Sequence, residues 1–297
     1  MAQGELSTQI TDSFKSMLPR AWRSDLPLVP VVRLSGIIGF STPLRPGLTL
    51  SSCARALDRA FGMKRAKAVA LAINSPGGSA VQSHLIFKRI RQLAQEKDKR
   101  VIAIVEDVAA SGGYMIACAA DEIVADQSSI VGSIGVVGGS FGFHGLLEKL
   151  GIERRLYTSG ENKAMLDPFL PERPEDVARL KAIQRDIHDS FIALVKSRRG
   201  AALPENDPDL FSGQYWTGER ALELGLVDRI GDLRSTLRDQ FGDNVHTPLV
   251  TTSRSLFGRQ APAIGGSVLD GLLDRPTLAE DMVSTLEARA LWARYGL

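Results

Sequence analysis

The chain has 297 residues, 44% of them hydrophobic and 24% charged, which is enough to bury the core of one large domain or two small ones. Lysine plus arginine (36) nearly balances aspartate plus glutamate (34), so the charge does not favour nucleic acid as a partner. The two cysteines, Cys53 and Cys118, exclude a disulfide framework and lack the spacing of a metal site. We therefore expect no metal, no cofactor and a reducing compartment.

The first 28 residues predict an amphipathic arm. Apolar side chains recur there at helical spacing over residues 6–18, and the opposite face carries few basic residues. This composition favours docking onto the protein itself or a neighbouring subunit over membrane binding. We find neither a basic region followed by an apolar core nor about 18 uninterrupted apolar residues, so we expect no signal peptide and no spanning helix. The expected location is the cytoplasm, with peripheral contact at the inner membrane face as the alternative.

From residue 29 onward, predicted strands alternate with predicted helices. Short apolar runs predict strands, and helical spacing predicts the segments between them. The predicted strands are 29–38, 67–73, 101–105, 122–125, 154–157 and 226–229, and the helices are 52–62, 80–95, 114–120, 141–150 and a short one capped by Thr217. Such alternation is typical of an α/β fold with a mainly parallel β-sheet wrapped by helices. In such a sheet, ligands usually bind at the carboxyl ends of the strands.

The segment from Pro174 to Gly200 predicts the best-defined helix. Pro174 suits the first helical position, acidic residues follow it, and Gly200 suits the carboxyl cap. Beyond His246 the composition changes, so residues 248–267 predict a linker and residues 277–293 a last helix. The predicted organisation is an arm (1–28), one domain (29–245), and a linker with a helical extension (246–297).

A corner of small residues at 109–113 follows the predicted strand 101–105 and precedes an apolar helical run. It places Ser111 at a helix N-terminus, where unpaired backbone N–H groups would stabilise an alkoxide or an oxyanion. An ordinary serine N-cap is the competing interpretation, since serine is a common cap. A cap does not require the two glycines that follow, whereas close approach of a ligand does.

A nucleophilic serine needs a base. The four histidines, His84, His144, His188 and His246, have no companion aspartate in a recognisable setting, and we predict that they are structural or solvated. The other route is a lysine held neutral by burial. The residues by themselves leave the choice of lysine open.

Five segments resemble, in order, the signature blocks of the signal peptide peptidase A family. They are LAINSPGGSA (71–80), VEDVAASGGYMIACAADEIVA (105–125), VGSIGVV (131–137), YTSGENKAMLDPF (157–169) and SGQYWTGERALELGLVDRIG (212–231). The resemblance covers about residues 29–241. It implies the ClpP/crotonase fold and a serine endopeptidase that cleaves short or unfolded apolar peptides, such as residual signal peptides.

The resemblance also implies the site. By position, Ser111 matches the family's nucleophile, Lys163 its general base, and Ser133 a serine that holds the lysine amine. Gly78 and Gly112 match the residues whose backbone N–H groups form the oxyanion hole. Because the chain holds one copy of the domain, the resemblance implies a ring-shaped homo-oligomer in which Lys163 of one subunit meets Ser111 of its neighbour.

Two other functions remain open from the sequence. Residues 218–230 (GERALELGLVDRI) occur in similar form in the crotonase branch, which favours an acyl-CoA hydratase or hydrolase as the alternative. A catalytically lapsed assembly scaffold is the non-enzymatic alternative, although the intact serine, lysine and glycine set counts against it. The sequence leaves open the ring size, the substrate, and whether the segment from Thr277 covers the groove.

Overall fold

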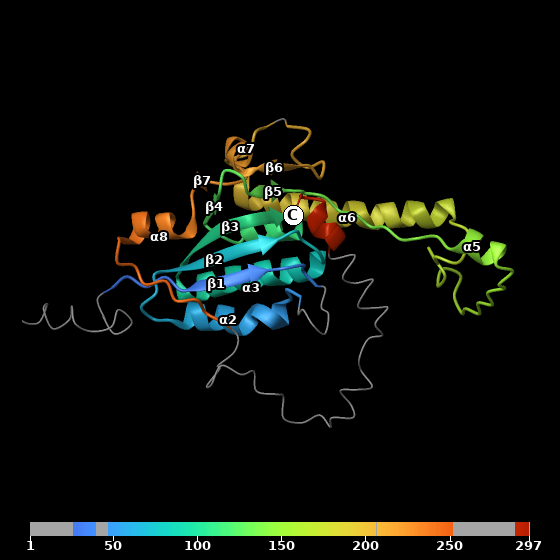
Figure 1. Cartoon of the computed structure of the whole chain (residues 1–297), viewed down its shortest axis with the longest axis horizontal. Coiled ribbons are helices and arrows are strands. Elements are labelled where there is room, and N and C mark those ends of the chain that lie inside the picture. Colours follow the sequence, from blue (N-terminus) through green and yellow to red (C-terminus); the bar gives the residue numbers. More distant parts are fainter. Residues whose placement is uncertain (1–25, 40–46, 206, 252–288, 297) are drawn as a thin grey trace, which may run out of the picture.

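The computed structural model describes residues 26–39, 47–205, 207–251 and 289–296. A seven-stranded sheet forms the centre of the described part (Figure 1). Its parallel strands follow the order β1 (Val31–Ser35), β2 (Ala68–Ser75), β3 (Arg100–Ala110), β4 (Glu122–Ala125) and β7 (Arg229–Ile230). β5 (Ile130–Gly132) pairs in parallel with the last residues of β3, and β6 (Tyr215–Thr217) pairs antiparallel with β5. This mainly parallel sheet with flanking helices confirms the predicted α/β, ClpP/crotonase-like fold class.

Two apolar clusters cover opposite faces of the sheet. Alternate residues of the central strands pack on one face against α2 (Leu50–Gly62), α3 (Ala80–Lys97) and α4 (Gly112–Ala117). The intervening residues pack on the other face against Leu237 of α8 (Leu233–Phe241). Because both faces of β2 and β3 are buried, these strands read as continuous apolar runs in the sequence.

Several predicted elements form close to their predicted bounds. α6 (Pro174–Arg199) begins at Pro174 and is capped by Gly200, and the Thr217 side chain caps α7 (Gly218–Glu223) by accepting from the Arg220 N–H. The predicted strand 154–157 is wrong, since these residues are exposed and pair with no strand in the described part of the chain. We did not predict α8, although Asp232 and Ser235 form a capping box at its start.

Residues 246–250, assigned to the linker by sequence, lie along the outer edge of β1. The Val29 N–H donates to the His246 carbonyl (2.9 Å), and the Val250 N–H donates to the Val31 carbonyl (2.8 Å). Val250 is buried in the main apolar cluster. The domain boundaries stay a prediction, as does the amphipathic arm, which lies almost entirely outside the described residues.

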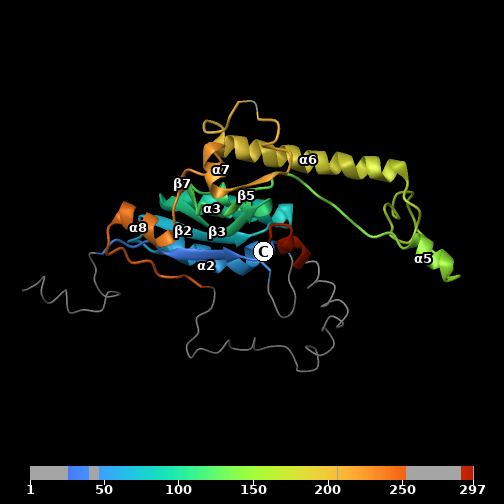
Figure 2. The same cartoon turned by 45° about the horizontal axis from the view of Figure 1, so that its top comes forward.

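Residues 138–173, which we call the projecting segment, lie away from the sheet. The segment contains α5 (His144–Lys149) and joins the amino end of α6, and both views show it beyond the sheet (Figures 1 and 2). It folds largely on itself: the Phe143 N–H donates to the Pro168 carbonyl (2.6 Å), and the Phe143 and Phe169 rings stack at 5.5 Å. α5 has no buried residue.

In the part of the chain that the structure describes, no helix is both long enough and apolar enough to cross a membrane.

Candidate active site

The pairing of β3 with β5 brings the two predicted serines together. Ala110 and Gly132, the last residues of these parallel strands, are register partners, so Ser111 and Ser133 follow at the same edge of the sheet. The Ser111 N–H donates to the Gly132 carbonyl at 2.8 Å, and the Ser133 N–H donates to the Gln214 carbonyl at 2.6 Å. Both serines have a positive φ, 52° for Ser111 and 54° for Ser133. The site therefore sits at the carboxyl ends of the strands, as expected for a sheet of this class.

Ser111 adopts a backbone conformation that residues with a side chain rarely take. Its φ of 52° and ψ of −120° place it at the sharp turn from β3 into α4. Although it occupies the N-cap position, its side chain makes no capping hydrogen bond, and no described residue bonds its hydroxyl. The N-cap interpretation is therefore wrong, and the hydroxyl is available for chemistry.

Close packing explains the glycines around Ser111. A Cβ on Gly77 would lie 2.8 Å from the Ser111 Cβ, and one on Gly112 would lie 2.2 Å from the Ser83 Oγ of α3. Real Cβ atoms do not approach so closely, so side chains at these positions would displace the turn. The glycines thus let β2, α3 and the Ser111 turn meet at one point.

Gly78 is fixed in the loop that follows β2. The Ile38 N–H donates to the Gly77 carbonyl, and the Ser79 N–H donates to the Ile38 carbonyl, each at 2.8 Å. Gly78 has a φ of 140°, and a Cβ there would lie 2.2 Å from the Ile38 oxygen. The N–H of Gly112, the first residue of α4, has no acceptor within its own helix. Both glycines line the same cavity as Ser111.

That cavity has a volume of about 540 Å³ and contains four of the five predicted site residues. Its lining includes Ser111, Ser133, Gly78 and Gly112, together with residues of three other segments. These are Gly135, Val136 and Val137 after β5, Ile187 and Phe191 of α6, and Ser212 and Gly213 before β6. Leu291, Arg294 and Tyr295 also line the cavity, and sequence reasoning did not identify them with the site.

Lys163, the fifth predicted residue, does not line this cavity. It lies exposed on the projecting segment, and no described residue pairs with its ammonium group. The four histidines also lie outside the cavity. His188 Nε2 lies 3.1 Å from the Ile134 carbonyl oxygen. The pKa of His84 on α3 is lowered mainly by burial and also by the positive charge of Lys88. Within one chain, the cavity thus contains an unbonded serine hydroxyl and no histidine.

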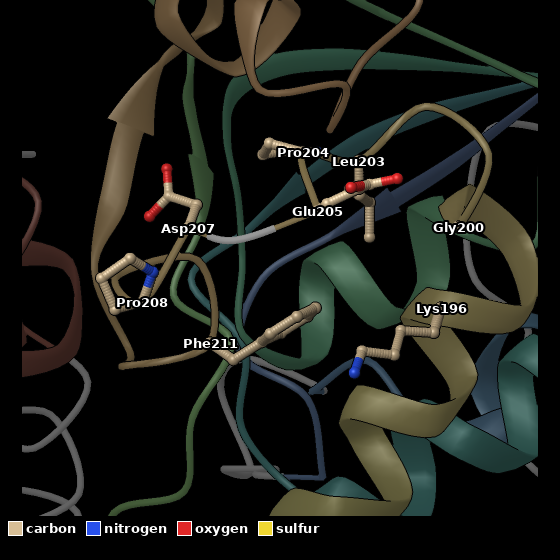
Figure 3. Close-up of a pocket in the computed structure, with 8 residues that line it drawn as sticks. All are labelled: Lys196, Gly200, Leu203, Pro204, Glu205, Asp207, Pro208 and Phe211. Atoms are coloured by element: carbon tan, nitrogen blue, oxygen red, sulfur yellow. The ribbon is translucent and has the colours of Figure 1, made fainter.

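A second cavity of about 550 Å³ lies beside the carboxyl end of α6 (Figure 3). Its lining includes Lys196, whose Nζ lies 5.3 Å from the centre of the Phe211 ring, and the carboxylates Glu205 and Asp207. Figure 3 shows no serine or cysteine among the labelled residues. Because it offers no serine, no cysteine and no strained backbone, we place the candidate active site at Ser111.

Comparison with known proteins supports this assignment. Residues 93–240 match Peptidase family S49, a span that includes Ser111, Ser133 and Lys163. The chain is also 33% identical over 225 residues to a Synechocystis protein that is named provisionally as a protease, covering 74% of this chain and 79% of that protein. The chain belongs to peptidase family S49. The resemblance to signal peptide peptidase A is thereby confirmed. An Arabidopsis thaliana relative named "Serine protease SPPA, chloroplastic" is 33% identical over 243 residues, which cover 75% of this chain and 35% of that protein.

A Brucella abortus protein named "Na(+)/H(+) antiporter NhaA" matches this S49 member along the whole length of the present chain. The two are 52% identical over 301 residues, which cover 100% of this chain and 41% of the Brucella protein. The chain therefore spans about two fifths of that relative. The name belongs to the longer protein, and the shared part contains the S49 region, residues 93–240 of this chain.

Proposed function

We propose that this S49 member is a serine endopeptidase with a Ser111/Lys163 dyad. The observation that carries the proposal is the free Ser111 hydroxyl, held on a strained turn in a cavity that Ser133, Gly78 and Gly112 also line. Strained backbone concentrates at functional sites because the surrounding structure must maintain it.

The proposed reaction uses each of these residues. The Ser111 Oγ attacks the peptide carbonyl carbon while the neutral Lys163 amine takes its proton. The carbonyl oxygen becomes an oxyanion that accepts hydrogen bonds from the Gly78 and Gly112 N–H groups. The Lys163 ammonium then protonates the leaving amine, and water hydrolyses the acyl-enzyme by the same path. Ser133 orients the lysine through its hydroxyl.

In the proposed assembly, Lys163 reaches Ser111 of a neighbouring subunit. The projecting segment supports this, since it carries large apolar side chains in contact with water, with Phe141 77% exposed and Tyr157 89% exposed. Contiguous exposed apolar surface marks an interaction site. Ile183 and Ile187 of α6 are exposed as well. A head-to-tail contact that buries this surface closes into a ring when the rotation allows.

The proposed substrates are short or unfolded peptides with small or apolar side chains before the cut, residual signal peptides among them. The cavity supports an extended apolar chain, because residues 135–137 form one wall without helix and Val136, Ile187 and Phe191 give it an apolar surface. An extended peptide can add to such a wall by strand pairing.

Labelling with a serine-reactive fluorophosphonate, followed by mass spectrometry of the modified peptide, tests the proposal. We expect label on Ser111 and cleavage of an unfolded protein faster than of its folded form. A crotonase-type acyl-CoA enzyme needs no serine nucleophile, so hydration or hydrolysis of an acyl-CoA with Ser111 unlabelled would refute the peptidase assignment.

A further inference from the structure

A small cavity adjoins the cavity that contains Ser111. Its volume is about 220 Å³, and its lining consists of one residue after β5 and four residues of α6: Val136, Lys181, Gln184, Arg185 and His188. Val136 also lines the Ser111 cavity, as do Ile187 and Phe191 of the same helix. The two cavities therefore share a wall, and a peptide bound in the larger one can reach the smaller one.

Contacts between α6 and the segment after β5 fix the position of this small cavity. His188 Nε2 lies 3.1 Å from the Ile134 oxygen and carries the proton of this hydrogen bond, because a carbonyl oxygen only accepts. A Cβ on Gly138 would lie 2.9 Å from the Gln184 Nε2, so the backbone passes directly beside that amide. Val136 lies midway between these two contacts in the sequence. Residues 134–138 are thus held against α6 on both sides of the small cavity.

Both cavities open along the same face of α6. Gln184, His188 and Phe191 recur at intervals of four and three residues, which places their side chains on one side of a helix. Since a helix rises about 1.5 Å per residue, Gln184 and Phe191 lie roughly 10 Å apart along its axis. The small cavity is nearer to the amino end of α6, which joins the projecting segment (Figure 1). It therefore continues the Ser111 cavity in one direction.

The side chains that line the small cavity suit an anion. Lys181 and Arg185 are exposed, and neither makes an ion pair or a hydrogen bond within the described part of the chain. They lie four residues apart, and like charges at this spacing destabilise a helix. Together with the Gln184 amide and the His188 ring, they give the lining several hydrogen-bond donors and no carboxylate. Such donors bind a carboxylate more strongly than a neutral group.

We propose that Lys181 and Arg185 form a subsite that binds a carboxylate of the peptide substrate. The carboxylate belongs to an aspartate or glutamate side chain, or to the carboxyl end of the peptide. The inference rests on the proposed function, because the ligand is the peptide that Ser111 attacks. An extended peptide advances about 3.3 Å per residue, and Val136 follows Ser133 by three residues in the cavity wall. The bound carboxylate therefore lies roughly three residues from the bond that is cut.

The subsite should change KM rather than kcat. A carboxylate held this far from the reacting bond is bound equally in the ground state and in the transition state, so it improves binding without accelerating the chemical step. Because Lys181 and Arg185 are exposed to water, each contributes modestly, and together they should lower KM about fivefold. Salt screens exposed charges, so raising NaCl from about 0.05 M to about 0.5 M should reduce the effect to about twofold.

The test measures KM and kcat of the full chain for matched apolar peptides that carry glutamate, glutamine or lysine at the third residue on either side of the cut. In wild type, KM for the glutamate peptide should be about fivefold lower than for the glutamine peptide. The double variant Lys181→Gln/Arg185→Gln should bring this ratio to about one, and Lys181→Glu/Arg185→Glu should favour the lysine peptide. Arg179→Gln changes an exposed charge of α6 outside the small cavity, so this matched control should keep the wild-type ratio.

A second pair of peptides distinguishes the two sources of the carboxylate. These peptides end at the third residue after the cut, one with a free carboxyl end and one with an amide. A lower KM for the free acid alone assigns the subsite to the carboxyl end of the substrate, and a lower KM for the glutamate peptide alone assigns it to a side chain. Either result supports the subsite.

Fluorescence anisotropy of the labelled peptides with the Ser111→Ala chain measures binding without cleavage. We expect the same order of affinities there, with the glutamate or free-acid peptide bound more tightly than its neutral partner. Equal KM and equal Kd within both pairs, while wild type still cleaves the peptides, would overturn the subsite alone. Absence of cleavage of every peptide by wild type would instead overturn the proposed function.

Discussion

Replacing Ser111 by glycine should stabilise the protein while abolishing its activity. The φ of 52° and ψ of −120° are unfavourable for a residue with a Cβ, at a cost of about 1–3 kcal/mol, whereas glycine adopts this region freely. Glycine also loses about 0.5–1 kcal/mol more backbone entropy on folding. Since the serine side chain makes no capping bond, no hydrogen bond is lost, and the net gain is roughly 0–2.5 kcal/mol, centred near 1 kcal/mol.

Urea unfolding followed by circular dichroism measures this difference, and for a domain of this size a gain of about 1 kcal/mol corresponds to a rise in Tm of roughly 2–4 °C. Ser111→Ala is the matched control, because it removes the hydroxyl and retains the Cβ, and its stability should stay near that of wild type. If Ser111→Gly is no more stable than Ser111→Ala, the turn stores no strain and the reasoning is refuted.

Three further predictions concern the dyad and the core. Lys163→Ala should abolish peptide cleavage, and Lys163→Arg should not restore it, because a guanidinium stays protonated. A cleavage rate unchanged in Lys163→Ala would remove Lys163 from the mechanism. Ser111→Ala and Lys163→Ala subunits, each inactive alone, should regain activity when co-expressed. In a randomly mixed ring, about a quarter of the interfaces should contain a working site. A verified mixed ring without activity would place the dyad within one chain. Burial raises the pKa of the Cys118 thiol to about 12, so iodoacetamide at pH 8 should modify Cys118 only after the protein unfolds. Mass spectrometry of the modified peptide measures this. Rapid modification of the native protein would contradict the burial of Cys118.

Local signals in the sequence predicted those elements whose structure is determined by neighbouring residues. The helix from Pro174 to Gly200 carries its own start and stop signals, and the buried strand before Ser111 is continuous and apolar. The small residues at 109–113 likewise indicated the sharp turn that holds Ser111. The helix forms at its predicted bounds, while the strand predicted at 101–105 continues to Ala110, and both form because packing and local preference agree.

The sequence did not predict contacts between distant segments. It also did not show that a strand-like segment would lack a partner strand. Residues 154–157 have the composition of a strand but belong to the projecting segment, where no neighbouring strand is present within the described chain. The place of Tyr295 in the cavity depends on contacts with Ser133 and Tyr215, which no local pattern reveals. The resemblance matched Lys163 to the family's general base. The sequence spacing between Ser111 and Lys163 gave no sign that Lys163 would lie outside the cavity of its own chain.

The hydrogen bonds that link Ser111 to Gly132, and Ser133 to Gln214, have a consequence for protein synthesis. The turn that holds Ser111 is bonded to β5, which follows it in the sequence, and β5 pairs in turn with residues near 215. A ribosome that has delivered Ser111 has therefore not yet delivered the chain that completes the site. The turn that holds Ser111 therefore lacks its complete set of strand partners in the growing polypeptide until β6 has emerged.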